Sequence, residues 1–301
     1  MRILVVVNTM AGGSDAGLYD YVRALGSANA EVTLRFCDEQ NRLEELVSDG
    51  TSFDRVVAAG GDGTASAICY ALRGTGVPIL VYPAGTANLL ALNLNLPVEA
   101  RSLGRLTLEG SHTSFDLGEI EYAQTPDGTG LRRGFAIMAG AGYDAAIMSS
   151  AQPLKATLGP AAYLVAAVTN LAPTASEFEL DLDGQHISTD GIAVLIVNFG
   201  RIQFELPVAY GADPRDGMFQ VAVMRTRNVA GLIPAVVAAF SGAEKVPGID
   251  VYVAAHVTVS AYPPLQMQYD GEVIDALTPF AARALPKAVQ LLVPADSPFA
   301  E

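Results

Sequence analysis

The chain has 301 residues, half of them apolar, which is enough material for two domains of ordinary size with their own cores. Its formal net charge of −14 and its scarcity of lysine argue against nucleic acid as a partner and against a polybasic membrane anchor, because both need clustered Lys and Arg. The apolar stretches fall short of the roughly 20 residues that a membrane span requires, and no signal peptide is visible. Cys37 and Cys69 both lie in apolar contexts, so we expect no disulfide framework and a cytoplasmic protein.

The first hundred residues alternate between apolar strands and amphipathic helices. The helical segments repeat apolar residues at a spacing of three or four, as in Leu18, Val22 and Leu25. The strands are predicted, in order, at Ile3–Val7, Glu31–Phe36, Arg55–Ala59 and Val77–Val81. Strands and helices that alternate at this pace predict a wound, parallel α/β sheet.

Three of these strands run into turns rich in glycine or asparagine, at Asn8–Ser14, Gly60–Thr64 and Pro83–Asn88. Ligands of such sheets lie at the carboxyl ends of the strands, so we expect the three turns to converge. The strand, glycine turn and helix start around Gly60–Thr64 are typical of backbone N–H groups aimed at a phosphate. Asp62 is unusual there, because a carboxylate repels phosphate unless a cation lies between them. The pattern indicates metal-assisted phosphate chemistry.

From about Ser114 onward the pattern changes to many strands with few helices. Strands are predicted at Phe115–Tyr122, Gly134–Met138, Glu177–Leu182, Gly191–Asn198, Met218–Met224 and Val251–Ser260, and helices at Ala161–Leu171 and Val229–Phe240. We therefore expect an α/β domain over residues 1–115 and a β-rich, sandwich-like domain over 116–284. The pattern leaves open whether residues from about 285 to 301, with a last strand at Ala288–Val293, return to the first domain.

At this point the motifs resemble a known family. Gly60-Gly61-Asp62-Gly63-Thr64, preceded by Asn8, Gly12 and Gly13 and followed by Pro83-Ala84-Gly85-Thr86-Ala87-Asn88, is similar to the diacylglycerol kinase catalytic-domain family. That family includes bacterial lipid kinases and sphingosine kinases, and it is distantly similar to NAD kinases. The likeness continues through Gly140–Ala145, Asp213–Met218 and Asp270-Gly271-Glu272, so it spans roughly residues 3 to 272.

The resemblance implies an ATP- and Mg²⁺-dependent lipid kinase of phospholipid metabolism that transfers the γ-phosphoryl group to a hydroxyl of diacylglycerol or a related lipid. It also implies that residues 1–115 form the nucleotide-binding domain and that the active site lies in the cleft between the two domains. It implies that Glu272 is the general base, with Asp270 beside it, and that Asp62 supports the metal network. It also implies a set of nucleotide-binding residues: Asn8, Gly12, Gly13, Gly60, Gly61, Gly63, Thr64, Gly85 and Thr86. Phosphoryl transfer needs alignment and charge neutralisation more than covalent help, so such a site is chemically plausible.

Four acidic or amide residues carry alternative interpretations. Asp213 and Asp216, with the carbonyl of Met218, can converge on one hard cation, as the resemblance implies for a structural metal, or can simply serve a β-turn. Asp144 contacts the substrate or caps the helix that follows it. Asn88 likewise contacts the substrate or caps the leucine-rich helix from Leu89.

One departure from the family pattern bears on the activity. Family members commonly carry an acid directly after the asparagine of the third loop, where this chain has Leu89. Two alternatives therefore stay open: an NAD-kinase-like enzyme with a soluble acceptor, or a nucleotide-binding regulatory protein with altered catalysis. For a chain of this charge, membrane contact would be local and transient, and the sequence leaves a homodimer open.

Overall fold

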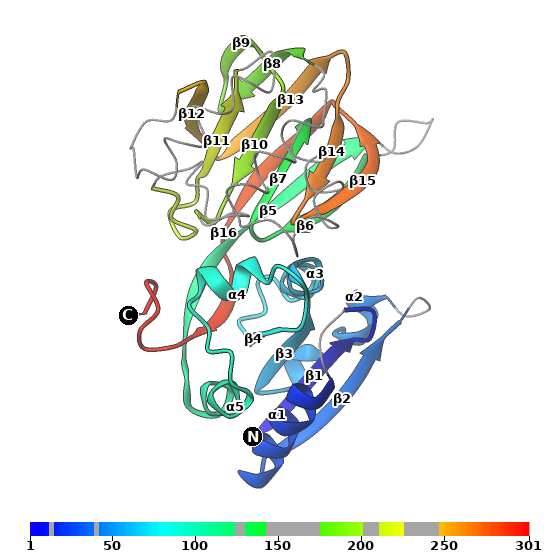
Figure 1. The fold of residues 1–301 in the computed structure, drawn as a ribbon, viewed down its shortest axis with the longest axis vertical. Coiled ribbons are helices and arrows are strands. Elements are labelled where there is room, and N and C mark those ends of the chain that lie inside the picture. The colour runs from blue at the N-terminus through cyan, green and yellow to red at the C-terminus, as the bar shows by residue number, and fades with distance from the viewer. Residues whose placement is uncertain are drawn as a thin grey trace, which may run out of the picture. The chain divides into compact units, whose positions relative to one another are not determined.

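The computed structural model describes residues 1–11, 15–38, 42–123, 130–142, 175–200, 211–225 and 247–300. The chain divides into two compact units, one formed by Met1–Leu117 with Leu285–Glu301 and the other by Gly118–Ala284. Two long strands, β5 (Ser111–Ala123) and β16 (Phe280–Val293), contribute residues to both units (Figure 1). The two helices predicted within 161–171 and 229–240 lie outside the described residues.

The first unit is built on a parallel sheet with the strand order β2-β1-β3-β4, which the end of β16 extends beside β4. The wound α/β sheet predicted from the sequence is therefore confirmed. The strands are β1 (Arg2–Asn8), β2 (Glu31–Cys37), β3 (Arg55–Gly60) and β4 (Pro78–Pro83). The helices are α1 (Asp15–Ser27), α2 (Leu43–Leu46), a 3₁₀ turn at Gly50–Ser52, α3 (Asp62–Ala71), α4 (Leu89–Asn93) and α5 (Ala100–Glu109).

The central strands β1 and β3 are buried along most of their length. Five consecutive residues of β1 are buried, which is typical of a parallel strand inside a sheet. One core cluster joins alternate residues of β1 to α1 and α5 through Tyr21, Leu25 and Leu103. Strand β2 lies at the edge of the sheet, and its residues alternate between half-buried and exposed. This edge strand therefore leaves apolar side chains open to solvent.

The second unit consists of antiparallel strands in two sheets around one shared core, as predicted. One sheet has the order β12-β11-β10-β7-β14-β15, and the other joins β16, β13, β8 and β9, with β5 and β6 beside β16. The strands not yet located are β6 (Gly130–Phe135), β7 (Met138–Gly142), β8 (Ser176–Leu182), β9 (Gln185–Gly191), β10 (Ala193–Val197), β11 (Phe219–Met224), β12 (Ile249–Ala254), β13 (His256–Tyr262), β14 (Gln266–Tyr269) and β15 (Glu272–Leu277).

Two predicted strands are in fact pairs of strands. The strand predicted over 134–138 is divided between β6 and β7, because the carboxylate of Asp270 accepts the backbone N–H groups of Ala136 and Ile137. The strand predicted over 251–260 is divided between β12 and β13, because Asp183 accepts the N–H groups of Ala255 and His256. In both cases a distant carboxylate takes the donor that a continuous ladder would have used.

Among the described residues five elements were missed altogether: the 3₁₀ turn at Gly50–Ser52, α5, β9, β14 and β15. Strands β9 and β15 are edge strands with mostly exposed or half-buried residues, so they lack the buried apolar signal used to find the others. Among the residues that the structure describes, none of the helices is long and apolar enough to cross a membrane.

Candidate functional site

The sheet of the first unit changes winding direction between β1 and β3, since the chain passes from β1 to its outer neighbour β2 and then back across to β3. Ligands of open α/β sheets bind at the carboxyl edge at such a point. Here the two loops are joined directly, because the Asn8 Nδ2 at the end of β1 donates to the Thr64 Oγ1 at 2.7 Å. The Asn8 Oδ1 also accepts the backbone N–H of Met10 at 2.9 Å. Asn8 thus fixes the loop after β1 against the glycine loop after β3.

In the loops at Gly60–Thr64 and Pro83–Asn88, which are the second and third loops, neighbouring atoms come so close to the backbone that only glycine fits. A Cβ at Gly60 would lie 2.6 Å from the Cβ of Thr64, and a Cβ at Gly85 would collide with the Cα of Gly61. The backbone of Gly61 leads into α3, whose first turn contains Asp62 and Gly63. The predicted convergence of these loops is therefore present, with glycine at the positions where no side chain fits.

Asp62 ties the second loop to the third. Its Oδ1 accepts the backbone N–H of Leu90, in the first turn of α4, at 2.9 Å, and the N–H groups of Leu89 and Asn88 also interact favourably with its charge. Burial raises the pKa of this carboxyl group, and these backbone hydrogen bonds act against that rise. The side chain predicted to support a metal network thus caps the start of α4.

Asn88 does not cap α4 with its side chain, although it occupies the N-cap position with a left-handed φ of 50°. Its Oδ1 accepts the N–H of Gly85 at 2.8 Å, and its Nδ2 donates to the carbonyl of Gly85 at 2.9 Å. The residue closes the third loop on itself and leaves the capping of α4 to Asp62. Thr86, at the tip of this loop, is exposed.

In the second unit the Asp270-Gly271-Glu272 turn joins β14 to β15. Asp270 is buried, and its carboxylate accepts the N–H groups of Ala136, Ile137 and Met138 at 2.8, 2.8 and 3.0 Å. Three backbone donors on one carboxylate make this residue an anchor for the β6–β7 connection. Asp270 is therefore a positioning residue for its turn.

Glu272 lies directly after this anchored turn and reaches solvent. Partial burial by neighbouring atoms desolvates its carboxyl group and raises the pKa above the usual range. A glutamate with a raised pKa is a stronger proton acceptor once ionised. The resemblance assigns the general base to this residue, and its position on a rigid turn suits that role.

Asn198, which was not predicted from the sequence, also holds the β6–β7 connection. It binds the carbonyl groups of this connection, whereas Asp270 binds the N–H groups. The Asn198 Nδ2 donates to the carbonyl of Ala136 at 2.7 Å, and its backbone N–H donates to the carbonyl of Ile137 at 2.8 Å. An asparagine that is buried at the end of an apolar strand is the signal that could have identified it.

The side chains at the proposed structural metal site are engaged with protein groups. Asp213 accepts from the Arg215 Nε at 2.8 Å and from its Nη2 at 3.1 Å, and the Asp216 Oδ1 accepts the N–H of Met218 at 2.8 Å. Within the described ranges no group of three or more His, Cys, Asp or Glu side chains is arranged to hold a metal ion. The structural metal at Asp213, Asp216 and the Met218 carbonyl, and the Mg²⁺ expected with ATP, therefore stay predictions.

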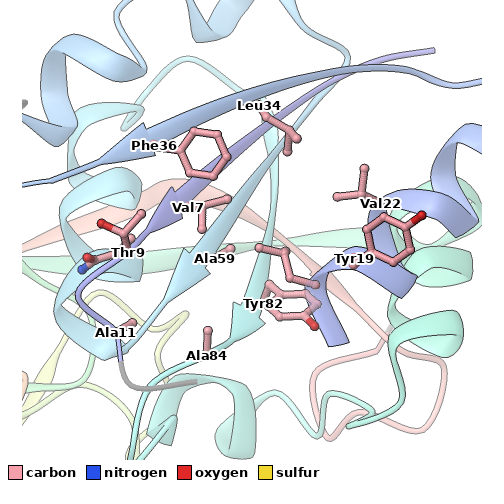
Figure 2. Close-up of a pocket in the computed structure, with 12 residues that line it drawn as sticks. Val7, Thr9, Ala11, Tyr19, Val22, Leu34, Phe36, Ala59, Tyr82 and Ala84 are labelled. Carbon is pink, nitrogen blue, oxygen red and sulfur yellow. The ribbon is translucent and has the colours of Figure 1, made fainter. Parts of the chain in front are cut away.

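The remaining predicted residues, Gly12, Gly13 and Asp144, lie outside the described residues. A cavity of about 390 Å³ lies beside Asn8, between α1 and the sheet, and was not anticipated from the sequence (Figure 2). Its walls are mostly apolar, including Tyr19 from α1 and Phe36 from β2.

The glycine loops and the Asp270–Glu272 turn both lie in regions that match known protein families. Residues 2–120 match the diacylglycerol kinase catalytic domain, and residues 137–293 match the YegS C-terminal NAD kinase beta sandwich-like domain. The chain belongs to this family of lipid kinases. Both the glycine loops and the Asp270–Glu272 turn lie inside the matched regions.

Several relatives are similar over most of the chain. A diacylglycerol kinase of Mycobacterium tuberculosis is 27% identical over 85% of this chain and 82% of its own length. A "probable lipid kinase YegS-like" of Klebsiella pneumoniae is 24% identical over 95% and 94%. An uncharacterized protein of Synechocystis sp. is 25% identical over 90% of this chain, which spans 62% of that protein's length.

Solved structures show the same fold at lower identity. A diacylglycerol kinase from Bacillus anthracis matches with a TM-score of 0.75 and 17% identity, over 97% of both chains. Yeast NADH kinase in complex with NADH matches with a TM-score of 0.60 and 11% identity, over 98% of this chain and 84% of the other. The architecture is thus shared between lipid kinases and kinases of dinucleotides.

Proposed function

We propose that this protein is a lipid kinase that transfers the γ-phosphoryl group of ATP to a hydroxyl of diacylglycerol or a related lipid. The observation that carries the proposal is the Asn8–Thr64 hydrogen bond at the switch point of the parallel sheet, which holds a glycine loop and the start of α3 in one place. Such a loop presents backbone N–H groups to a phosphate. The lipid kinase names of its relatives favour a lipid acceptor over a soluble one.

In the proposed reaction the lipid hydroxyl attacks the γ-phosphorus, the bond to the β,γ-bridging oxygen breaks, and ADP leaves. Glu272 accepts the proton of the hydroxyl, and its raised pKa makes it a stronger proton acceptor once it is ionised. Asp270 holds the turn that carries Glu272, through its three backbone donors. Asp62 holds the third loop and α4 in register with the glycine loop. Mg²⁺, when bound with ATP, supplies charge neutralisation on the phosphates.

Incubation of the purified chain with γ-labelled ATP and a panel of acceptors tests this function. The panel contains diacylglycerol, monoacylglycerol, sphingosine and ceramide in mixed micelles, with NAD as a soluble acceptor. We expect label in the glycerolipid fraction. Label in NAD alone would replace the proposal with a dinucleotide kinase, and ATP binding without transfer to any acceptor would indicate a regulatory protein.

A further inference from the structure

An open groove of about 630 Å³ lies between helices α1 and α5, which pack side by side in the first unit (Figure 1). The two helices meet closely, because a Cβ at Gly104 of α5 would lie 3.3 Å from the Cβ of Ala24 of α1. None of the described residues that line this groove belongs to the loops at the ends of β1, β3 and β4 or to the cavity beside Asn8. The groove is therefore a separate feature of the first unit.

Positive side chains outnumber negative ones along this groove, although the whole chain is acidic. The sequence has 32 acidic residues against 18 lysines and arginines, so a surface patch of average composition would carry more acids than bases. The groove instead carries Arg23 from α1 and Arg101 and Arg105 from α5, against Asp20 and Glu109. Three guanidinium groups gathered in this way attract an anion locally, even on a protein of negative net charge.

The three arginines are available to a ligand. No ion pair joins Arg101 or Arg105 to any carboxylate in the part of the chain that the structure describes. Arg23 pairs with Asp20 at 2.9 Å, but both side chains are more than half exposed, and exposed ion pairs are weak. An anion in the groove therefore competes with little for any of the three guanidinium groups.

Arg101 and Arg105 also occupy unfavourable positions on α5. Arg101 lies in the first turn, where the positive end of the helix dipole favours acids, and this turn contains no acidic residue. Arg105 follows four residues later, so two like charges repel each other on one face of the helix. Residues that weaken their own helix without a compensating contact are typical of functional sites. Their placement indicates a ligand that supplies the missing negative charge.

The charge and the size of the groove define the class of this ligand. The planar fork of a guanidinium group matches the oxygens of a phosphate, and a phosphate monoester carries nearly two negative charges at neutral pH. A volume of about 630 Å³ is in the range of small-molecule pockets, so there is room for an organic body beside the phosphate. Asp20 and Glu109 would repel a broad anionic surface such as a membrane, whereas a compact phosphate fits between the arginines.

We propose that the groove between α1 and α5 binds a small soluble phosphate monoester, whose phosphate is held by Arg23, Arg101 and Arg105. The site does not depend on the proposed kinase activity, so the failure of either proposal leaves the other standing. An anionic membrane is the competing ligand for the same arginines, and it would bind them as vesicles but not as a free phosphate monoester.

Calorimetry of the full chain with glycerol 3-phosphate as the probe tests this site, with glycerol as the uncharged reference. We expect wild type to bind glycerol 3-phosphate with about millimolar affinity or better, and not to bind glycerol. Arg101→Gln and Arg105→Gln should each weaken the binding about ten-fold, which corresponds to about 1.4 kcal/mol. Arg105→Lys keeps the charge but not the planar fork, so its affinity should fall between those of wild type and Arg105→Gln. Arg42→Gln, which removes an exposed arginine of the same unit outside the groove, is the matched control and should bind as wild type does.

Two further measurements separate the groove from other anion sites. Gly85→Ala disturbs the glycine loops and should bind glycerol 3-phosphate as wild type does. A loss of binding in Gly85→Ala but not in the arginine variants would place the phosphate at the glycine loops and overturn the proposal. Sedimentation with phosphatidylglycerol vesicles tests the membrane: vesicle binding that depends on Arg101 and Arg105, without affinity for glycerol 3-phosphate, would overturn it too. So would a wild-type chain that binds no glycerol 3-phosphate at all.

Discussion

The Asp62 Oδ1 at the start of α3 accepts the backbone N–H of Leu90 at the start of α4, at 2.9 Å. This bond joins two loops that lie 28 positions apart in the sequence. It gives a physical reason for an acid beside the glycine loop, because the carboxylate satisfies backbone donors that would otherwise be left without an acceptor. This chain has Leu89 at the position where relatives commonly carry an acid, and the carboxylate of Asp62 accepts the backbone N–H of Leu90 at the start of α4.

Removal of this carboxylate should affect both stability and catalysis. We expect Asp62→Ala to lower the free energy of unfolding by about 1 kcal/mol, the usual cost of losing a helix cap, and to abolish phosphoryl transfer because the third loop loses its tether. Circular dichroism should show an unchanged fold, and denaturant titration measures the loss. Full activity in this variant would contradict the role assigned to the loop.

The raised pKa of Asp62 makes a prediction about pH. The native state holds the Asp62 proton to a higher pH than the unfolded state does, whose pKa is about 3.9. Stability from this group is therefore full below about pH 4 and falls as pH rises through the native pKa. The amide of Asp62→Asn does not titrate. As pH rises from about 4 through the native pKa of Asp62, the unfolding free energy of wild type should therefore fall relative to that of the variant. A difference that is constant from pH 3 to 7 would contradict the burial of this carboxyl group.

The contact of Gly85 with Gly61 predicts that two glycine-to-alanine substitutions, at Gly85 and at Gly26, have opposite effects. Gly85→Ala should separate the second and third loops and weaken ATP binding by at least ten-fold, because the added methyl collides with the Gly61 backbone. Gly26→Ala, in α1, meets nothing within 4 Å and should stabilise the protein by about 0.5–1 kcal/mol while leaving ATP binding unchanged. Calorimetry and thermal unfolding of both variants provide the check, and equal effects of the two would refute the contact.

Asp270→Asn tests the anchor of the acidic turn. The amide retains one acceptor oxygen for three backbone donors and turns an NH₂ toward the others, so we expect a loss of about 1–3 kcal/mol in the free energy of unfolding. Glu272→Gln, two residues along, is the matched control and should stay within about 0.5 kcal/mol of wild type. Similar stability of both variants would show that the three bonds do not hold the turn.

Much of the architecture could be predicted because strongly periodic segments carry their own signal. The parallel strands from Ile3 to Val81 and the antiparallel second unit follow from apolar runs and turn residues alone. The divisions of the strands at Ala136 and Ala255 could not be predicted, because they depend on Asp270 and Asp183 from distant parts of the chain. Local pattern does not reveal which carboxylate will take a given backbone donor.

The site shows the same limit. The residues of the glycine loops follow from the motif, and their convergence follows from the rule for parallel sheets. The partner of Asp62, the self-closure of the loop by Asn88 and the open cavity beneath α1 depend on tertiary packing. Each is a relationship between segments that a single sequence does not pair.

The measurement that tests the central claim most directly is the transfer of label from γ-labelled ATP to diacylglycerol by wild type and Glu272→Gln, with ATP affinity measured on both. The account predicts phosphatidic acid from wild type, with an activity that rises with pH through a value above the usual glutamate range because Glu272 must be ionised. It predicts unchanged ATP binding but at least a hundred-fold loss of turnover in Glu272→Gln, as expected for a general base. Equal turnover by the two proteins, or no lipid product from wild type that binds ATP, would contradict it.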